Sequence, residues 1–267
     1  MKKLLLNRII TLLAFCLLAA YTASKAKEMR VIDPAAQNKP LSGGMTFTGN
    51  SGNKPLPGSP YSYQVWSASG DDNKLIWYGP DQGGGAAFRA EWNNANVFLG
   101  RVGYQWNEGK PYTEYKNVFC DFNFKRSANG TGGGTSYIGI YGWTRKPLIE
   151  WYIVEDWYGD GAIGPEAIGG KAVKMGEFTV DGATYFIYQA TRVYQPSIDG
   201  TATFPQYFSV RQTCRQYGTI SITEHFKEWE KTGMKLGTNI YEAKFLVEAG
   251  SGTGWFDAAY ISFYQKD

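Results

Sequence analysis

Short stretches in which apolar and polar residues alternate, separated by glycine-rich turns, fill the chain between residues 61 and 264. Successive side chains of an extended strand point to opposite faces, so this alternation predicts strands that each have one buried face. The 43 Tyr, Phe and Trp residues favour half-buried sheets, and the 33 Gly supply turns and bulges. Strands are expected at residues 61–66, 87–92, 97–101, 118–124, 137–143, 149–157, 183–192, 206–212, 243–248 and 258–264.

One helix is expected at residues 222–232. Ser221 stands three residues before a glutamate, which is capping-box spacing, and Ile222, Phe226 and Trp229 share one helical face. Many short strands with one amphipathic helix favour an all-β fold over an α/β fold. The sequence therefore predicts a β-sandwich or jelly roll of two stacked, curved antiparallel sheets, rather than a closed barrel.

The first 26 residues have the layout of a secretory signal peptide, with a basic start, an apolar run and small residues before a cleavage site near Ala26. The apolar run is shorter than the roughly 20 residues that span a membrane. Cleavage would remove four basic residues and no acidic ones, so the formal charge would change from +3 to −1. Nothing then favours nucleic-acid binding. Residues 27–44 are expected to be a tail or linker, and residues 45–267 a single domain.

Two cysteines, Cys120 and Cys214, would remain after cleavage. In an oxidising compartment they either form a disulfide or stay reduced and buried, and the sequence favours neither alternative. The single histidine, His225, lies in the expected helix, where a surface position is favoured over a role in a Ser-His-Asp or Cys-His enzyme. No cluster has zinc-ligand spacing, and no glycine-rich loop has a phosphate-binding pattern, so no metal or cofactor is expected.

The remaining chemistry is that of carboxylates among aromatic residues. Glu150 lies inside an apolar strand, where it shares one face with Tyr152, while Glu155 points to the opposite face and is interpreted as structural or surface-exposed. Glu248 stands at the end of a second apolar strand. Hydrolysis of a glycosidic bond needs two carboxyl groups. Each glutamate alone is equally well explained as an edge-strand charge, and spacing does not show that the two face each other.

Four blocks of sequence carry a closer resemblance. They are Tyr141–Glu155, Pro196–Gly200, Phe204–Arg211, and the set formed by His225–Trp229, Gly233–Gly237 and Leu246–Gly250. In their order and separation, from about Tyr61 to Tyr264, the chain closely resembles glycoside hydrolase family 11, the small secreted endo-1,4-β-xylanases. The details are most similar to members from rumen and gut microbes.

The resemblance implies a jelly roll shaped like a partly closed right hand, whose thumb tip corresponds to Pro196–Gly200. It makes Glu150 the nucleophile and Glu248 the acid/base of a retaining double displacement, without a cofactor. Xylan is the implied partner of a secreted and monomeric protein that binds neither nucleic acid nor, after cleavage, a membrane. The residues implied to contact the sugar chain are Trp66, Asn96, Tyr141, Trp143, Tyr152, Arg192, Pro196, Ser197, Ile198 and Gln206.

A few positions depart from the pattern of the family. Trp151 stands where tyrosine is usual, Phe208 where tryptophan is common, and Ala249 follows the expected acid/base. The stretch from Tyr158 to Lys174 resembles a modified loop. These departures concern the outer parts of the substrate site rather than the reaction. Two alternatives stay open, a β-1,4-glucanase on the same fold and a non-catalytic carbohydrate-binding protein, although the thumb block argues against the glucanase.

Asn96 leads to a first prediction. An asparagine at this position resembles family members active near neutral pH, so we expect an optimum at about pH 5.5–7. Asn96→Asp would add a second carboxylate that couples to Glu248, and the optimum is expected to move to lower pH. A pH–rate profile of both proteins checks this, and an unchanged optimum would exclude the role of Asn96.

Overall fold

The computed structural model describes residues 41–107, 109–127, 136–159 and 172–267. The expected signal peptide (1–26), nearly all of the expected tail (27–44) and most of the loop between Tyr158 and Lys174 lie outside the described residues. Within the described ranges, no helix is long and apolar enough to cross a membrane.

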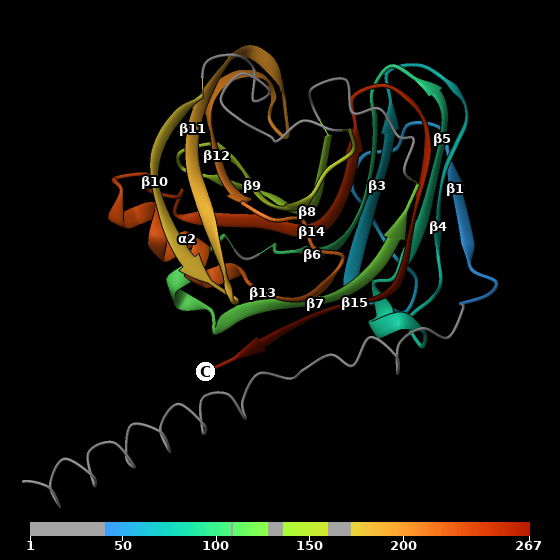
Figure 1. Ribbon diagram of the computed structural model, residues 1–267, viewed down its shortest axis with the longest axis horizontal. Helices are drawn as coiled ribbons and strands as arrows, with labels where there is room; N and C mark the ends of the chain where they lie inside the picture. The colour runs from blue at the N-terminus through green and yellow to red at the C-terminus, as the bar shows by residue number, and fades with distance from the viewer. Residues whose placement is uncertain (1–40, 108, 128–135, 160–171) are drawn as a thin grey trace, which may run out of the picture. The chain divides into compact units, whose positions relative to one another are not determined.

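The described strands form two sheets, which Figure 1 shows stacked face to face with the nine-stranded sheet strongly curled. The order of the six-stranded sheet is β1 (Met45–Thr48), β4 (Asp71–Trp77), β5 (Phe88–Ala95), β15 (Gly252–Lys266), β7 (Asn117–Arg126) and β13 (Tyr217–Ser221). The order of the nine-stranded sheet is β10 (Val173–Val180), β11 (Ala183–Ser197), β12 (Gly200–Arg211), β9 (Ile149–Asp156), β8 (Ser136–Arg145), β14 (Asn239–Ala249), β6 (Phe98–Gln105), β3 (Tyr61–Ser67) and β2 (Lys54–Pro55). The jelly roll of two stacked sheets is confirmed.

All ten expected stretches are strands, although most of the strands extend beyond the stretches expected. Residues 45–48 form the edge strand β1. The missed strands β2, β4, β10 and β13 are short, begin with polar residues or lie largely exposed. In β10 none of the eight side chains is fully buried, and the residues that pack against the core, Phe178 and Val180, are only partly covered, so its alternation is short and weak.

The main core lies between the sheets and takes every second residue of their strands. Trp151 and Ile153 of β9 and Phe245 and Val247 of β14 point into it, where they meet Phe122 of β7 and its neighbours. Their sequence neighbours point to the other face of the nine-stranded sheet. Because both faces of this sheet are packed, a polar side chain on either face is removed from water and needs a partner.

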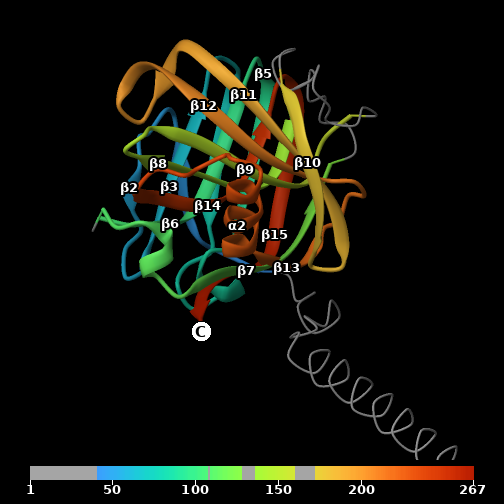
Figure 2. The ribbon, with the colours of Figure 1, turned by 90° about the vertical axis from the view of Figure 1, so that its left-hand side faces the viewer.

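Helix α2 (Ile222–Lys231) forms where the sequence predicts it and lies across the strands in Figure 2. Phe226 and Trp229 are fully buried, and the Phe226 ring meets Trp151 edge to face at 4.8 Å between ring centroids. The expected capping box is wrong. The Ser221 hydroxyl donates to Asp181 at 2.7 Å, and no side-chain capping bond forms at the helix start. The Ser221 hydroxyl binds Asp181, which lies outside the helix, instead of the backbone N–H group that a capping box would use.

The expected surface position of His225 is also wrong. The side chain is fully buried, and neither ring nitrogen has a hydrogen-bond partner among the described residues. The ring stands nearly perpendicular to Phe178 and Tyr185, at 5.1 and 4.7 Å between centroids. The helical pattern placed it beside polar Glu224, but β10 and β11 cover this side of α2. Burial, helped by the positive charge of Arg215, lowers the pKa of His225 to about 3.

The cysteines do not form a disulfide. Both are free, Cys120 buried in the core and Cys214 exposed. The predicted alternative of a disulfide is therefore wrong, and the alternative of two reduced, buried cysteines holds only for Cys120. Strand pairing puts Cys120 of β7 opposite Phe263 and Ile220 on its two neighbours, and Cys214 lies in the loop between β12 and β13.

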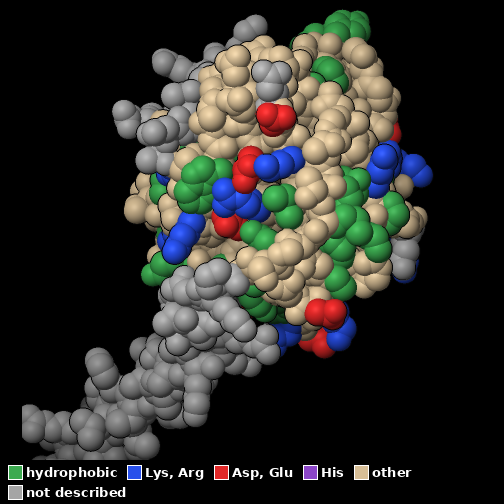
Figure 3. All heavy atoms as spheres, turned by 90° about the vertical axis from the view of Figure 1, so that its right-hand side faces the viewer, with side chains coloured by type: hydrophobic (Ala, Val, Ile, Leu, Met, Phe, Trp, Pro, Cys, Tyr) green, Lys and Arg blue, Asp and Glu red, His purple; other side chains and the backbone are tan. Residues whose placement is uncertain are grey.

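The face on the side of β1, β4 and β5 gathers acidic and basic side chains at its middle (Figure 3). On these strands Lys74 pairs with Glu91 at 2.7 Å, and Arg89 pairs with both Glu91 and Asp257, the latter at 3.0 Å. Each of these side chains is about one-third exposed. Ion pairs in that setting add little to stability, because solvent screens them and long side chains lose entropy. This face needs no functional explanation.

The buried histidine predicts a pH-dependent stability. The unfolded chain binds a proton at His225 below about pH 6.5, whereas the folded chain does so only near pH 3. Above pH 6.5 the imidazole is neutral in both states and does not oppose folding. As the pH falls, proton binding increasingly favours the unfolded state. Between pH 6 and pH 4 the free energy of unfolding of the wild type should fall faster than that of His225→Phe, by about 1.4 kcal/mol per pH unit. Denaturant titrations of both proteins measure this, and parallel losses would contradict it. His225 is the only histidine of the chain, so no other imidazole contributes.

Candidate active site

The side chains of the nine-stranded sheet that point away from the main core form a second cluster, here called the outer face. Aromatic rings dominate it, and they pack edge to face or stacked, as for Tyr152 on Phe208 with centroids 4.8 Å apart. The outer face thus resembles a protein interior in its close aromatic packing. Its buried members are Tyr137, Tyr141, Trp143, Tyr152, Val154, Ala172, Tyr188, Ala190, Phe204, Phe208, Val210 and Leu246.

Glu150 lies on the outer face in β9, between β8 and β12, and is 7% exposed. Antiparallel pairing with β8 puts Trp143 opposite it, and parallel pairing with β12 puts Gln206 beside it. Three donors reach its carboxylate: the Tyr141 hydroxyl at 2.7 Å and the Tyr152 hydroxyl at 3.1 Å bind Oε1, and Gln206 Nε2 binds Oε2. The charge of Glu150 is therefore accommodated by the sheet itself.

Glu248 is on β14, where it pairs with Tyr137 of β8 and Leu99 of β6. Its Oε2 atom is shielded from solvent and has no hydrogen-bond partner among the described residues. Burial first, and then the negative charge of Glu150, raise the pKa of Glu248 to about 8, although Arg101 and Arg192 act in the opposite direction. A carboxyl group in this environment keeps its proton near neutral pH.

The two carboxyl groups therefore differ in their preferred protonation state. Burial also raises the pKa of Glu150, but the hydrogen bonds from Tyr141, Gln206 and Tyr152 oppose that rise by stabilising the ionised form. No donor among the described residues reaches Glu248 Oε2. Near neutral pH the raised pKa of Glu248 favours its protonated form, while the three donors around Glu150 favour the ionised form of that carboxyl group.

Several other residues singled out in the sequence are found around this pair. Tyr141, Tyr152 and Gln206 bind Glu150 directly, and Trp143 Nε1 donates to the Tyr141 hydroxyl at 2.5 Å. Arg192 of β11 affects the pKa of both glutamates through its charge. These residues come from four strands, β8, β9, β11 and β12.

The expected thumb is the turn between β11 and β12. Pro196 is exposed, Ser197 accepts a hydrogen bond from the backbone of Asp199, and Ile198 packs against the outer-face cluster. The Asp199 carboxylate binds Arg145 at the end of β8 with contacts of 2.6 to 3.0 Å. The tip is therefore attached both to the outer face and to the end of a central strand.

Trp66 and Asn96 lie further from the pair. Trp66 is 38% exposed on β3, opposite Leu99, in the row of paired residues that also contains Glu248. Asn96 is exposed just before β6, and its backbone N–H donates to Ser69 Oγ at 3.1 Å. No hydrogen bond joins its side chain to Glu248 among the described residues.

Tyr137 belongs to the site although the sequence did not single it out. It pairs with Glu248, its ring lies 5.2 Å from that of Tyr152, and burial together with the charges of Glu248 and Glu150 raises its pKa. A usable signal was present, because Tyr137 and Tyr141 are four residues apart in one strand and so share a face. Arg101 was missed as well, since it ended a short expected strand.

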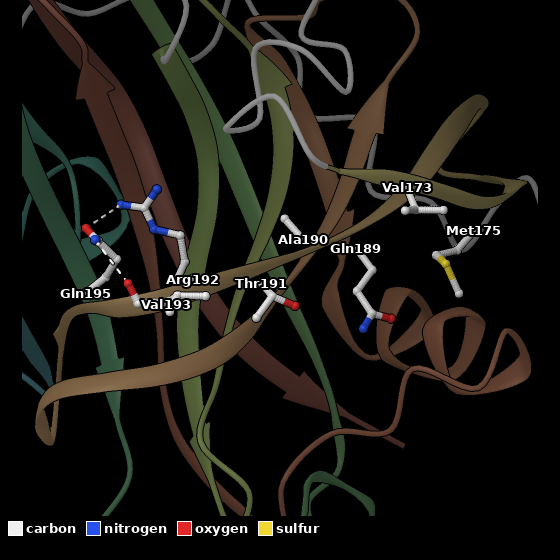
Figure 4. Close-up of a pocket in the computed structure, with 8 residues that line it drawn as sticks. All are labelled: Val173, Met175, Gln189, Ala190, Thr191, Arg192, Val193 and Gln195. Atoms are coloured by element: carbon white, nitrogen blue, oxygen red, sulfur yellow. Dashed lines mark hydrogen bonds between the residues drawn. The ribbon is translucent and has the colours of Figure 1, made fainter.

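A hollow of about 640 Å³ follows β10 and β11, as Figure 4 shows. Of its lining residues, only Arg192 belongs to the predicted site. In the figure its guanidinium turns toward Gln195, whose side-chain oxygen accepts a hydrogen bond from it at 3.2 Å. The lining residues are Val173, Met175, Gln189, Ala190, Thr191, Arg192, Val193 and Gln195.

Comparisons with known proteins show the family of the chain. The model of the family "Glycosyl hydrolases family 11" matches residues 59–259. Endo-1,4-beta-xylanase C of Fibrobacter succinogenes is 49% identical over 221 residues, which are 83% of this chain and 33% of that protein. Endo-1,4-beta-xylanase S20 of Neocallimastix patriciarum is 41% identical over 231 residues, 85% of this chain and 64% of that protein. The chain thus spans between one-third and two-thirds of the length of these relatives.

A solved structure gives the same fold. The crystal structure of the wild-type ENZbleach xylanase superimposes with a TM-score of 0.84 at 56% sequence identity. The match covers 89% of this chain and 93% of that one.

The hydrogen bonds to Glu150 lead to a prediction about its titration. Tyr141→Phe removes a donor that favours the ionised carboxylate, so the pKa of Glu150 should rise, by about one pH unit for one charged hydrogen bond. Carbon NMR of the glutamate side-chain carboxyls, followed against pH, measures this shift. Tyr112→Phe is a matched control, because Tyr112 donates to Glu230 at 2.7 Å near helix α2. If both variants leave Glu150 unchanged, the tyrosine does not stabilise its charge.

Proposed function

The chain belongs to glycosyl hydrolases family 11, and we propose that it is an endo-1,4-β-xylanase that hydrolyses internal bonds of xylan with retention of configuration. The observation that carries the proposal is the arrangement of Glu150 and Glu248 on one face of the sheet. One carboxylate has three donors, and the other carboxyl has a raised pKa and an enclosed oxygen that no described residue binds. The names of its relatives support xylan as the substrate.

In the proposed first step, Glu248 gives its proton to the glycosidic oxygen while the Glu150 carboxylate attacks the anomeric carbon. The bond between that carbon and the leaving oxygen breaks, and a glycosyl–enzyme ester forms on Glu150. This requires a protonated Glu248, which its raised pKa favours near neutral pH, and an ionised Glu150, which the hydrogen bonds from Tyr141, Gln206 and Tyr152 stabilise.

The second step returns the enzyme to its starting state. Once Glu150 is esterified its negative charge is gone, and the charge that raised the pKa of Glu248 is gone with it. Glu248 can then take a proton from water, whose oxygen attacks the same anomeric carbon and releases Glu150. Two displacements on opposite faces of the sugar give net retention.

The sugar chain is proposed to lie along the outer face, beneath the thumb tip. Tyr141, Tyr152 and Gln206 would orient Glu150 and contact sugar hydroxyls, and Trp66 is exposed as a ring platform further along. An exposed indole on a sheet suits stacking on a sugar ring, because one face of a pyranose is apolar. The remaining proposed contacts are Asn96, Trp143, Arg192, Pro196, Ser197 and Ile198.

Export of the protein is also part of the proposal. It rests on the signal-peptide pattern of residues 1–26 and on a catalytic domain at residues 45–267, which encloses the matched range 59–259. A secreted monomer acting on extracellular xylan, without nucleic-acid or membrane partners, is the corresponding expectation.

Glu150→Gln and Glu248→Gln are expected to fold and to lose xylan hydrolysis by at least a hundredfold each, because each removes a group that reacts in the transition state. Release of reducing ends from xylan measures the loss. Glu177→Gln, on the exposed strand β10, is the control that should keep wild-type activity. Proton NMR of the first products should show the β-anomer of the new reducing end before mutarotation.

Other outcomes would point elsewhere. Equal release from carboxymethylcellulose would favour a β-1,4-glucanase or a broad-specificity enzyme. Binding of xylan without release would make the protein a carbohydrate-binding protein, and initial release of the α-anomer would exclude retention.

A further inference from the structure

A group of charged side chains is buried on the same side of the nine-stranded sheet as the glutamate pair. Arg101 of β6 is 3% exposed, and Glu242 and Lys244 of β14 are fully buried. The Arg101 guanidinium binds Glu242 Oε1, and Lys244 Nζ binds Glu242 Oε2 at 3.0 Å. Burying three charges costs free energy, and apolar residues of similar size commonly replace such groups without loss of stability.

Neighbouring polar side chains complete this cluster. Gln64 of β3 accepts from Arg101 Nε at 2.7 Å through its side-chain oxygen. Asn53, in the segment just before β2, donates to Glu242 Oε2 at 2.6 Å and accepts from Lys244 Nζ. The segment between β1 and β2, to which the sequence assigned no role, thus closes the cluster. Every member is held by at least one partner, so the position of Arg101 is fixed from several directions.

Arg101 also connects this cluster to the candidate site. Its guanidinium carbon lies 4.3 Å from the centroid of the Tyr141 ring, in cation–π geometry. Tyr141 is the residue whose hydroxyl donates to Glu150 at 2.7 Å. Strand pairing places Lys244 directly beside Tyr141 and Arg101 beside Leu246, so this contact follows from the register of β14 with its two neighbours.

We propose that Arg101, held by Glu242, Lys244, Gln64 and Asn53, is a positioning residue of the hydrolytic reaction. Its planar guanidinium fixes the ring of Tyr141 and thereby the hydrogen bond that Tyr141 donates to the nucleophile Glu150. The inference rests on the proposed function and adds to it a residue that touches neither the substrate nor the reacting atoms.

The charge of Arg101 has a second, separable effect, because it opposes the raised pKa of Glu248. Lys244 keeps its own proton at the pH of the expected optimum, since burial lowers its pKa only to about 8. The charge on Glu248 is therefore set by several groups at once. They are Glu150 of β9, Arg101 of β6 and Arg192 of β11. The charge of Glu248 in turn raises the pKa of Tyr137 of β8 and Tyr152 of β9, and the other titratable groups around Arg101 are Tyr141, Glu242 and Lys244.

Two substitutions separate the shape of the guanidinium from its charge. Arg101→Lys keeps the charge and loses the planar group, so kcat on xylan should fall roughly tenfold to a hundredfold with KM little changed. The acidic limb of its pH–rate profile should move to higher pH, and the basic limb should stay. Arg101→Met should in addition move the basic limb to higher pH, because Glu248 loses a positive neighbour.

A double-mutant cycle tests whether Arg101 acts through Tyr141. In a Tyr141→Phe background, Arg101→Lys should lower kcat no further, because the hydrogen bond it secures is already absent. Independent, multiplicative losses would overturn the proposed route. The cycle needs only the lysine variant, so it remains decisive if Arg101→Met does not fold.

Arg126 is a matched control in the other sheet. It binds Asp156 through two contacts of 2.7 and 3.0 Å, and its guanidinium lies 5.0 Å from the Tyr158 ring centroid. Arg126→Lys and Arg126→Met should lower the melting temperature and leave both pH limbs in place. If the Arg101 variants behave in the same way, the cluster is merely structural. If the wild type does not hydrolyse xylan at all, the proposed function fails first, so the two failures are distinguishable.

Discussion

The three hydrogen bonds that converge on Glu150 are the interaction on which the candidate site depends. A carboxylate that is 7% exposed among aromatic rings would normally take up a proton, because burial disfavours its charge. Two phenol hydroxyls and one amide keep the ionised form accessible. All three donors sit on strands, where the pleat fixes side-chain direction. The hydrogen bonds to Glu150 therefore depend on the rigidity of the sheet rather than on the conformation of a loop.

The rest of the fold supplies that rigidity. The six-stranded sheet and helix α2 cover one face of the nine-stranded sheet with a core of aromatic and aliphatic residues, and the outer face carries its own aromatic cluster. Close packing across β8 also requires glycine at one position. A Cβ atom on Gly142 would lie 2.1 Å from the Trp151 ring and 2.1 Å from the Glu242 carbonyl. A side chain at residue 142 would therefore clash both with the core, through Trp151, and with the neighbouring strand β14, through Glu242.

The sequence predicted individual strands and the helix better than the strand pairings and side-chain contacts between distant segments. Period-two patterns located the strands with one buried face, and the 3.6-residue pattern located α2, because both depend on neighbours in the chain. Ser221 and His225 were misjudged because their surroundings come from distant segments: Asp181 takes the serine, and β10 and β11 bury the histidine. Gln206 stands beside Glu150 only through a parallel strand pairing that spacing does not reveal. Its role, like that of Tyr152, came from resemblance, whereas Arg101 had no signal of either kind.

The other buried carboxylates show what is unusual about Glu248. Glu155, which points into the main core, binds Arg215 and the Tyr185 hydroxyl, Asp156 binds Arg126, and Glu242 binds Arg101 and Lys244. Each of these carboxylates has a partner of opposite charge that stabilises its ionised form. Glu248 has instead an enclosed oxygen without a partner among the described residues, and a negative neighbour in Glu150. Structural carboxylates minimise the free energy of burial, whereas a general acid must keep a proton that it can give away. The enclosed oxygen of Glu248 without a partner is therefore an argument for function. The charges of the Arg101 cluster, in contrast, are paired with one another, so they act on the site from a fixed position.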